Sequence, residues 1–171
     1  AIAMEDRGEI IACDLHENKL KRVREGAARL GLTSIHGKAA DGRVFLEEWR
    51  NAFDVVLVDA PCSGLGILRK KPDIRRKRAD SLFTLPVVQS AILENAARYV
   101  RPGGTLLYST CTVLPEENEE VTDAFLGTHP EFSRETFLLP EPIGQVGGQI
   151  TLWPHLHNTD GFYICRMTRR V

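Results

Sequence analysis

Apolar runs and amphipathic stretches alternate along this chain of 171 residues. Short apolar runs at Glu9–Cys13, Ser34–His36 and Phe53–Val58 predict three β-strands. The run Phe53–Val58 is almost continuously apolar, which is typical of a strand that is buried on both faces. Residues 17–30 place apolar side chains at helical spacing, and we predict a helix there that Gly31 ends. The predicted buried face of this helix holds Leu20, Val23, Ala27 and Leu30.

The same alternation continues in the second half of the chain. Residues 86–100 predict an amphipathic helix that buries Val88, Ile92, Ala96 and Tyr99. The segment Arg101–Gly104 stops this helix and turns into a predicted strand at Thr105–Tyr108. The remaining apolar runs predict a weak strand and a last strand, at Thr136–Leu139 and Gly161–Met167.

A further helix is predicted to open near Pro115, which is a favourable residue for a first turn. Its first turns are acidic, and negative charge at that end suits the helix dipole, so these side chains need no functional explanation. The acids are Glu116, Glu117, Glu119 and Glu120.

Strands that alternate with helices predict a Rossmann-like α/β domain with a mostly parallel sheet and helices on both faces. No repeat or linker divides the sequence, so we expect residues 1–171 to form a single domain. A nucleotide-binding domain of this class opens with a strand and a Gly-rich turn, about twenty residues before an acid that binds ribose. Asp14 is placed like that acid, yet Gly8 is the only glycine before it. We therefore expect the first strand and the Gly-rich loop to be missing, and the sequence to be the C-terminal piece of a longer protein.

Composition indicates an ordinary globular protein, with 43% hydrophobic and 26% charged residues. No apolar run reaches the length of a membrane span, and no secretory signal opens the chain. The four cysteines form no Cys-x-x-Cys pair, which argues against a zinc site or a disulfide scaffold and favours the cytoplasm. Cys13 and Cys165 lie inside strand patterns and are expected to be small buried residues.

The net charge of −1 excludes a generic polyanion binder, but the charge is unevenly distributed. Residues 69–78 hold seven bases and one acid. Such a run is commonly a solvated loop or helix face. Because it follows Cys62 closely, a segment that contacts phosphates is the sharper interpretation. The bases that we expect to contact phosphates are Arg69, Lys70, Lys71, Arg75 and Arg76.

Cys62 and Cys111 each follow directly after an apolar strand pattern, the first in Asp59-Ala60-Pro61-Cys62 and the second in Ser109-Thr110-Cys111. Carboxyl ends of parallel strands meet at one edge of a sheet, where ligands bind, so we expect both thiols at the same edge, beside Asp59. A thiol and a carboxylic acid suit methylation of cytosine at carbon 5. A thiolate adds to carbon 6, and the acid stabilises the charge that develops near ring nitrogen 3. Either cysteine alone is also compatible with a small buried residue.

Asp14 and Asp41 follow the first two predicted strands as Asp59 follows the third. Carboxylates at this edge suit the ribose hydroxyls and the amino group of an adenosine cofactor. Turn formers or helix caps are the alternative roles for each of them.

Three long motifs carry a resemblance to a known family. The stretch Phe53–Gly66, continuing through Arg69 to Asp73, resembles the fourth motif of the RNA cytosine-5 methyltransferases of the Sun (Fmu) type. Arg101–Thr112 followed by Pro115–Asn118 is similar to the sixth motif, and Asp160–Tyr163 resembles the eighth. The resemblance spans nearly the whole chain. Within the family it points to the bacterial enzymes that methylate small-subunit ribosomal RNA.

The resemblance implies a role for each candidate residue. Cys111 is the expected nucleophile and Cys62 the residue that assists product release, a ranking that residue chemistry alone leaves open. S-adenosylmethionine is the implied cofactor and ribosomal RNA the implied partner, with no metal and no membrane. Asp14 is expected to hold the ribose and Asp41 the adenine, while Asp59 lies between cofactor and cytosine.

The family's Gly-Gly-Lys-Thr loop is absent from this sequence. We therefore expect the isolated chain to bind S-adenosylmethionine weakly or not at all and to be inactive alone. An alternative interpretation is a non-catalytic RNA-binding module or inactive fragment that uses the basic 69–78 segment. A small-molecule methyltransferase is a third possibility, which the paired cysteines disfavour.

Overall fold

The computed structural model describes residues 1–76 and 84–171. Lys77 and Arg78 of the basic segment lie outside the described residues. The described chain forms two compact units, an N-terminal unit of residues 1–45 and a C-terminal unit of residues 46–171. The single domain expected from the sequence stays a prediction. Among the helices of these two ranges, none is sufficiently long and apolar to span a bilayer.

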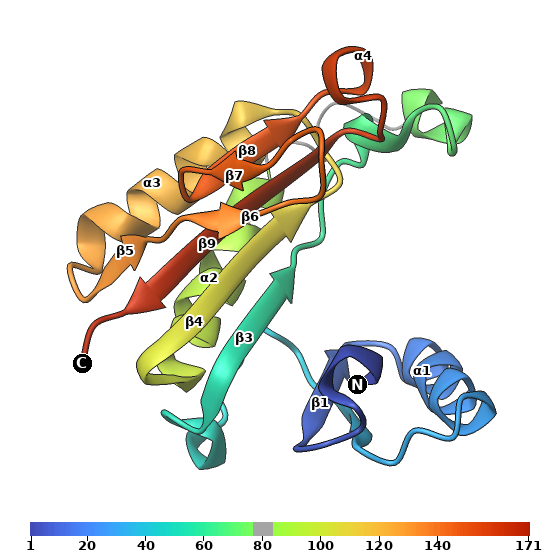
Figure 1. Cartoon of the computed structure of the whole chain (residues 1–171), viewed down its shortest axis with the longest axis vertical. Helices are drawn as coiled ribbons and strands as arrows, with labels where there is room; N and C mark the ends of the chain where they lie inside the picture. Colours follow the sequence, from blue (N-terminus) through green and yellow to red (C-terminus); the bar gives the residue numbers. More distant parts are fainter. Residues whose placement is uncertain (77–83) are drawn as a thin grey trace. The chain divides into compact units, whose positions relative to one another are not determined.

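The N-terminal unit is a small β-α-β arrangement (Figure 1). Its elements are the 3₁₀ turn η1 (Ile2–Met4), β1 (Ile10–Asp14), α1 (Glu17–Arg29) and β2 (Ile35–Ala39). The two strands pair in parallel, with Asp14 opposite Ala39. Helix α1 occupies the predicted range and buries Leu20 and Ala27, whereas Val23 and Leu30 of the predicted face are exposed.

The C-terminal unit is built on a five-stranded sheet with the order β3-β4-β9-β5, in which β8 also pairs with β9. Its longer elements are β3 (Phe53–Asp59), α2 (Leu85–Tyr99), β4 (Val100–Thr110), α3 (Glu119–Thr128) and β9 (Phe162–Arg169). The shorter strands are β5 (Phe132–Arg134), β6 (Phe137–Leu138), β7 (Gln145–Val146) and β8 (Gln149–Leu152). Single turns lie at η2 (Glu47–Trp49), η3 (Leu65–Ile67), η4 (Pro72–Arg76), η6 (Pro115–Glu117) and α4 (Pro154–His157).

Strands β3 and β4 are parallel and are joined through α2, as the sequence pattern predicts. Strand β9 runs antiparallel to β4, β5 and β8. Helices α2 and α3 pack side by side on one face of this sheet (Figure 1). The core between them and the strands includes Leu93, Leu106 and Phe125. Each such side chain, fully buried, contributes roughly 1.5–3 kcal/mol to folding. The α/β class with a Rossmann-like arrangement is thereby confirmed.

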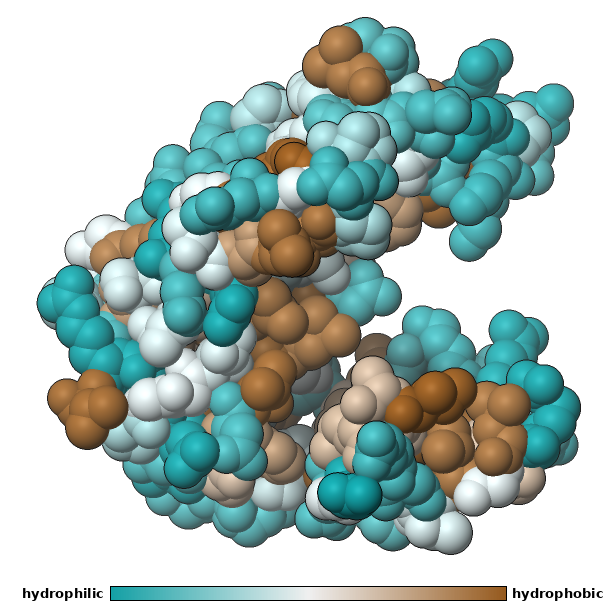
Figure 2. All heavy atoms as spheres, in the orientation of Figure 1, coloured by the Kyte–Doolittle hydropathy of each residue, from teal (hydrophilic) through white to brown (hydrophobic). Residues whose placement is uncertain are grey.

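Strand β3 is not buried on both faces, and that expectation is wrong. Val58 is buried, while Val55 is 56% and Leu57 is 64% exposed. Figure 2 shows hydrophobic side chains gathered over β3 on this face of the C-terminal unit. The near-continuous apolar run gives one covered face and one apolar face that α2 does not cover, because both helices lie on the other side of the sheet.

Strand β4 also begins earlier than predicted. Its pairing with β3 starts at Val100 opposite Phe53, and the register then shifts before Val55 meets Thr105. Gly103 within this stretch has a φ of 77°, which a residue with a side chain rarely adopts. The predicted turn is therefore an irregular first part of the strand.

Candidate active site

The two strand-end cysteines meet at the carboxyl edge of the parallel pair β3–β4. Asp59 lies opposite Ser109 in the ladder, so the chain leaves both strands at the same level. Cys62 Sγ lies 3.1 Å from Cys111 Sγ, and the backbone N–H of Cys111 donates to Cys62 Sγ at 3.3 Å. Both side chains are half-buried. The structure thus brings together the two thiols that the sequence placed at one edge.

Burial raises the pKa of the Cys62 thiol to about 12, and the hydrogen bond with Cys111 acts in the same direction. Cys62 is therefore a neutral thiol near pH 7. As a neutral thiol it can donate its S–H to Cys111 Sγ.

A group of buried polar side chains lies beneath the two thiols, and we call it the buried polar cluster. It consists of Ser63, Gln89, Thr110, Thr112, Glu117 and Asn118. Ser63 Oγ donates to Thr112 Oγ1 at 2.8 Å, which links the residue after Cys62 to the residue after Cys111. Because buried polar groups are costly unless they are bonded, this cluster fixes the backbone around the thiols.

Gly66 and Gly161 join a third segment to the two cysteine loops. The N–H of Gly66 donates to the Cys111 carbonyl at 3.0 Å, and the N–H of Gly161 donates to the Gly66 carbonyl at 2.8 Å. A Cβ on Gly66 would lie 2.1 Å from the Gly161 carbonyl oxygen. Only glycine permits this approach, which ties the segment before β9 to the site.

The expected RNA-contacting bases are all exposed in the C-terminal unit. Asp160, which is 6% exposed, forms an ion pair with Arg69 at 3.1 Å and a second, closer ion pair with Lys70. Lys70 and Arg69 hold the pKa of this carboxyl below its ordinary value. The further exposed bases are Lys71, Arg75 and Arg76.

The three candidate carboxylates lie at strand ends. Asp59 is the exposed last residue of β3 in the C-terminal unit. Asp14 ends β1 in the N-terminal unit, and Asp41 follows β2 by two residues there. Burial acts to raise the pKa of Asp14, but hydrogen bonds from the His16 N–H and from Lys19 outweigh it.

Asp41 is held in the same way by a neighbouring base. The Arg43 side chain and backbone N–H lower the pKa of Asp41 to about 2. Asp14 and Asp41 are therefore both ionised at neutral pH. Ionised carboxylates accept hydrogen bonds, so this pair fits the hydroxyls and amino group of an adenosine ligand.

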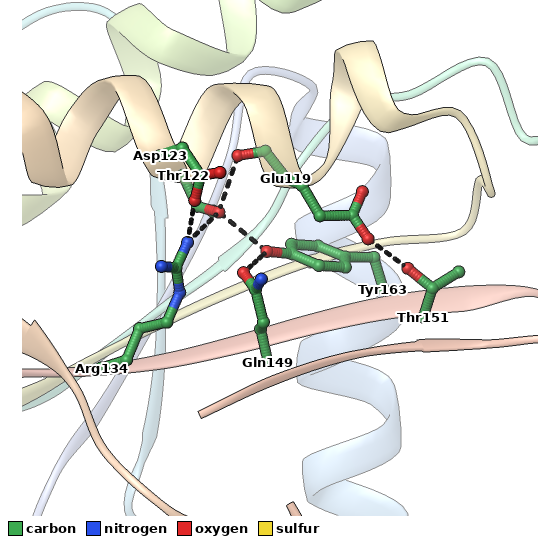
Figure 3. A network of polar contacts seen from close by, with 7 residues as sticks. All are labelled: Glu119, Thr122, Asp123, Arg134, Gln149, Thr151 and Tyr163. Carbon is green, nitrogen blue, oxygen red and sulfur yellow. Dashed lines mark hydrogen bonds and ion pairs between the residues drawn. The ribbon is translucent and has the colours of Figure 1, made fainter. Parts of the chain in front are cut away.

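A second polar network connects α3 to the C-terminal strands (Figure 3). Thr122 Oγ1 and Tyr163 OH lie 2.7 Å apart, and Tyr163 OH donates to Gln149 Oε1 at 2.7 Å. Thr151 Oγ1 donates to Glu119 at 2.7 Å. These contacts hold the first turns of α3 against β8 and β9.

Two sequence-based expectations about single residues are wrong. Glu117 was placed among the acids in the first turns of a helix, but α3 begins later, at Glu119, and Glu117 is 1% exposed. Cys13 is exposed rather than buried, whereas Cys165 is buried as expected. The roles of Gln89, Glu117, Asn118 and Asp160 were missed. A Glu-Asn pair between Pro115 and an acidic helix start is the one local signal that sets Glu117 apart from its neighbours.

Parallel strands that deliver side chains to one edge, with an α-helical crossover, are typical of Rossmann-like domains, the class to which the S-adenosylmethionine-dependent methyltransferases belong. Solved structures agree with this class. The crystal structure of PH0851 superposes with a TM-score of 0.86 and 37% identity, over 96% of this chain and 38% of that one. The structure of NSun6 from Pyrococcus horikoshii with SFG superposes with a TM-score of 0.78 and 28% identity, over 99% of this chain and 43% of that one.

Residues 1–168 match the model of the 16S rRNA methyltransferase RsmB/F family, and the chain belongs to that family. It is 43% identical to the probable ribosomal RNA small subunit methyltransferase B of Bacillus subtilis over 98% of its length. It is 33% identical to the ribosomal RNA small subunit methyltransferase F of Erwinia tasmaniensis over 99% of its length. The chain spans 39% and 37% of these two curated relatives.

Proposed function

We propose that this chain supplies the catalytic centre of an RNA cytosine-5 methyltransferase. The reaction transfers a methyl group from S-adenosylmethionine to carbon 5 of a cytosine in small-subunit ribosomal RNA. The observation that carries the proposal is the 3.1 Å contact between Cys62 Sγ and Cys111 Sγ at the ends of adjacent parallel strands. The names of the relatives support the ribosomal RNA substrate.

In the proposed reaction the Cys111 thiolate adds to carbon 6 of the cytosine and forms a C–S bond. Asp59 lies near ring nitrogen 3 and, as a carboxylic acid, donates its proton to the negative charge that develops there. Carbon 5 then takes the methyl group, and the bond between that methyl group and the cofactor sulfur breaks to leave a thioether. Its proton passes to a base, and the electron pair of that C–H bond restores the ring double bond as the C–S bond breaks. The neutral Cys62 thiol, in contact with the Cys111 sulfur, assists this release.

S-adenosylmethionine supplies the methyl group when it is bound. Asp14 is proposed to accept from the ribose hydroxyls and Asp41 from the adenine amino group, as ionised carboxylates at strand ends. Binding of the analogue SFG by the NSun6 relative supports this choice of ligand. The exposed bases Arg69, Lys70 and Lys71 are proposed to contact RNA phosphates, together with Arg75 and Arg76.

The two cysteine roles are tested on the full-length protein with its ribosomal RNA and radiolabelled S-adenosylmethionine. Cys111→Ala should abolish methyl transfer, because no C–S bond forms. Cys62→Ala should accumulate a covalent protein–RNA adduct that survives denaturing electrophoresis. Cys13→Ala, at an exposed position of the N-terminal unit, serves as the matched control and should methylate normally. Full activity of Cys111→Ala would overturn the assignment.

A non-catalytic RNA-binding module is the second candidate, favoured by the exposed basic residues of the 69–76 segment. It accounts for the bases but leaves the two contacting thiols without a purpose. RNA binding without an adduct in Cys62→Ala and without methyl transfer in the wild type would support the module instead.

A further inference from the structure

Glu117 and the amide of Gln89 hold the backbone on both sides of Cys62. Glu117 Oε2 accepts from the Ser63 N–H at 2.9 Å and from Gln89 Nε2 at 2.8 Å. Gln89 Nε2 also donates to the Pro61 carbonyl at 2.9 Å. The residue before Cys62 and the residue after it are therefore bonded to one buried pair that comes from η6 and α2.

Asn118, the next residue along the chain, does the same for Cys111. Asn118 Oδ1 accepts from Thr110 Oγ1 at 2.5 Å, and Asn118 Nδ2 donates to the Thr112 carbonyl at 3.2 Å. Two consecutive residues thus hold the two cysteine loops, one loop each. Because consecutive Cα atoms lie a fixed distance apart, the residue that holds one cysteine loop is tied to the residue that holds the other.

Packing alone does not account for this choice of side chains. Glu117 is a nearly fully buried carboxyl whose partners are an uncharged amide and a backbone N–H. Its Oε1 has no hydrogen-bond partner among the described residues. An apolar side chain of similar size would fill the same space without the cost of burying a carboxyl group. The carboxyl group adds two directed hydrogen bonds, which hold the Ser63 N–H and the Gln89 amide in place at the same time.

We propose that Glu117 and Asn118 are positioning residues that set the separation of the Cys62 and Cys111 sulfurs. Their effect on methylation rests on the proposed function, in which Cys111 attacks the base while Cys62 stays within reach of its sulfur. Their effect on the distance between the two thiols does not rest on the proposed function. This effect is measurable without RNA or cofactor.

The readout is the equilibrium between the two thiols and their disulfide in a glutathione buffer. One glutathione disulfide is reduced to two glutathione molecules as Cys62 and Cys111 lose two protons and two electrons and join. Peptide mapping by mass spectrometry gives the oxidised fraction of this pair separately from Cys13 and Cys165. Because the equilibrium constant depends on how well the two sulfurs are held together, it reports the positioning directly.

Glu117→Ala and Asn118→Ala should each lower this equilibrium constant about tenfold or more, since each frees backbone groups beside one thiol. Glu117→Gln keeps one acceptor oxygen and should restore the constant to within about threefold. Gln89→Met keeps the side-chain length, removes both donor contacts, and should lower the constant as well. If Glu117→Ala does not fold, Gln89→Met tests whether the buried pair positions Cys62.

Thr122→Val is the matched control. It removes a buried hydroxyl from the other network of α3, the one drawn in Figure 3, and leaves the cysteine loops untouched. It should lower the melting temperature while the thiol equilibrium stays within about twofold of wild type.

An unchanged thiol equilibrium in folded Glu117→Ala or Gln89→Met overturns the proposal. An equal fall of the thiol equilibrium constant in Thr122→Val also overturns the proposal, because the constant would then follow the stability of the protein alone. Active Cys111→Ala with a shifted thiol equilibrium in Glu117→Ala would refute the methylation mechanism and leave the positioning role standing.

Discussion

Cys62 is half-buried just beyond the end of β3, and this environment favours its neutral thiol. Burial is the main cause, and contact with Cys111 adds to it. A neutral Cys62 thiol can donate its S–H to the Cys111 sulfur, 3.1 Å away. The environment around Cys62 therefore disfavours its thiolate, which agrees with the proposal that Cys62 is not the nucleophile.

Alkylation by iodoacetamide should reveal the raised pKa of Cys62 at the level of the single residue. In Cys111→Ser, modification of Cys62 should rise with pH only well above the ordinary range of a thiol, because only the thiolate reacts. In urea the same residue should titrate normally. A pKa raised on folding stabilises the native state at neutral pH, and that stability is lost as pH rises from the ordinary thiol value toward 12. Equal profiles in the folded and unfolded protein would contradict the burial of Cys62.

At the scale of elements, the basic segment and the start of β9 are joined through Asp160. Arg69 and Lys70 each pair with this nearly buried carboxylate. Arg75 and Arg76 lie in η4, further along the segment, and both are exposed. Among the described bases of the segment, Asp160 therefore anchors Arg69 and Lys70, whereas the exposed Lys71, Arg75 and Arg76 lie beyond this anchor.

The salt dependence of RNA binding tests that division. The double variant Arg75→Ala/Arg76→Ala should weaken binding of single-stranded RNA and reduce the slope of log affinity against log salt by about 0.7 per lost contact. Fluorescence anisotropy across a salt series gives the slope. The double variant Arg22→Ala/Arg29→Ala in α1 removes an equal charge outside the segment and should leave the slope unchanged. Equal slopes for all three proteins would exclude η4 from the RNA contact.

Elements with a regular period were predictable, and those set by tertiary contact were not. Helix α1 and the strands β1, β3 and β9 lie close to their predicted ranges, because their apolar spacing is local information. Strands β5, β7 and β8 are two to four residues long and depend on their partners in the sheets for pairing. Glu117 shows the same limit at the site. Its neighbours in sequence are acids at a helix start, but its neighbours in space are the groups around Cys62.

At the scale of the whole molecule, β3 is one of the two end strands along the order β3-β4-β9-β5 in the C-terminal unit, among the described residues. Its exposed Val55 and Leu57 add an apolar surface to unpaired backbone groups. Edge strands with this character pair with other chains unless charge or cover prevents it. We expect a second copy of the chain to be the partner that this edge finds in a concentrated solution.

Sedimentation velocity over a range of concentrations tests this expectation. The wild-type chain should associate, and Leu57→Lys should weaken the association about tenfold or more, since one buried leucine side chain is removed from the interface. Val87→Lys places the same charge on an equally exposed apolar position of α2, away from the edge, and should associate like wild type. If Leu57→Lys and wild type sediment alike, the contact lies elsewhere.

The close approach of Gly66 and Gly161 has a consequence for the gene. Every glycine codon becomes an alanine codon by one base change at its second position. At residue 66 the added methyl group would meet the Gly161 carbonyl, and at residue 161 it would meet the Gly66 backbone and Val113. Either allele would separate β9 from the cysteine loops while leaving every proposed reacting side chain unchanged. A scale of amino-acid similarity ranks both changes as mild, whereas the backbone contact marks them as loss-of-function variants.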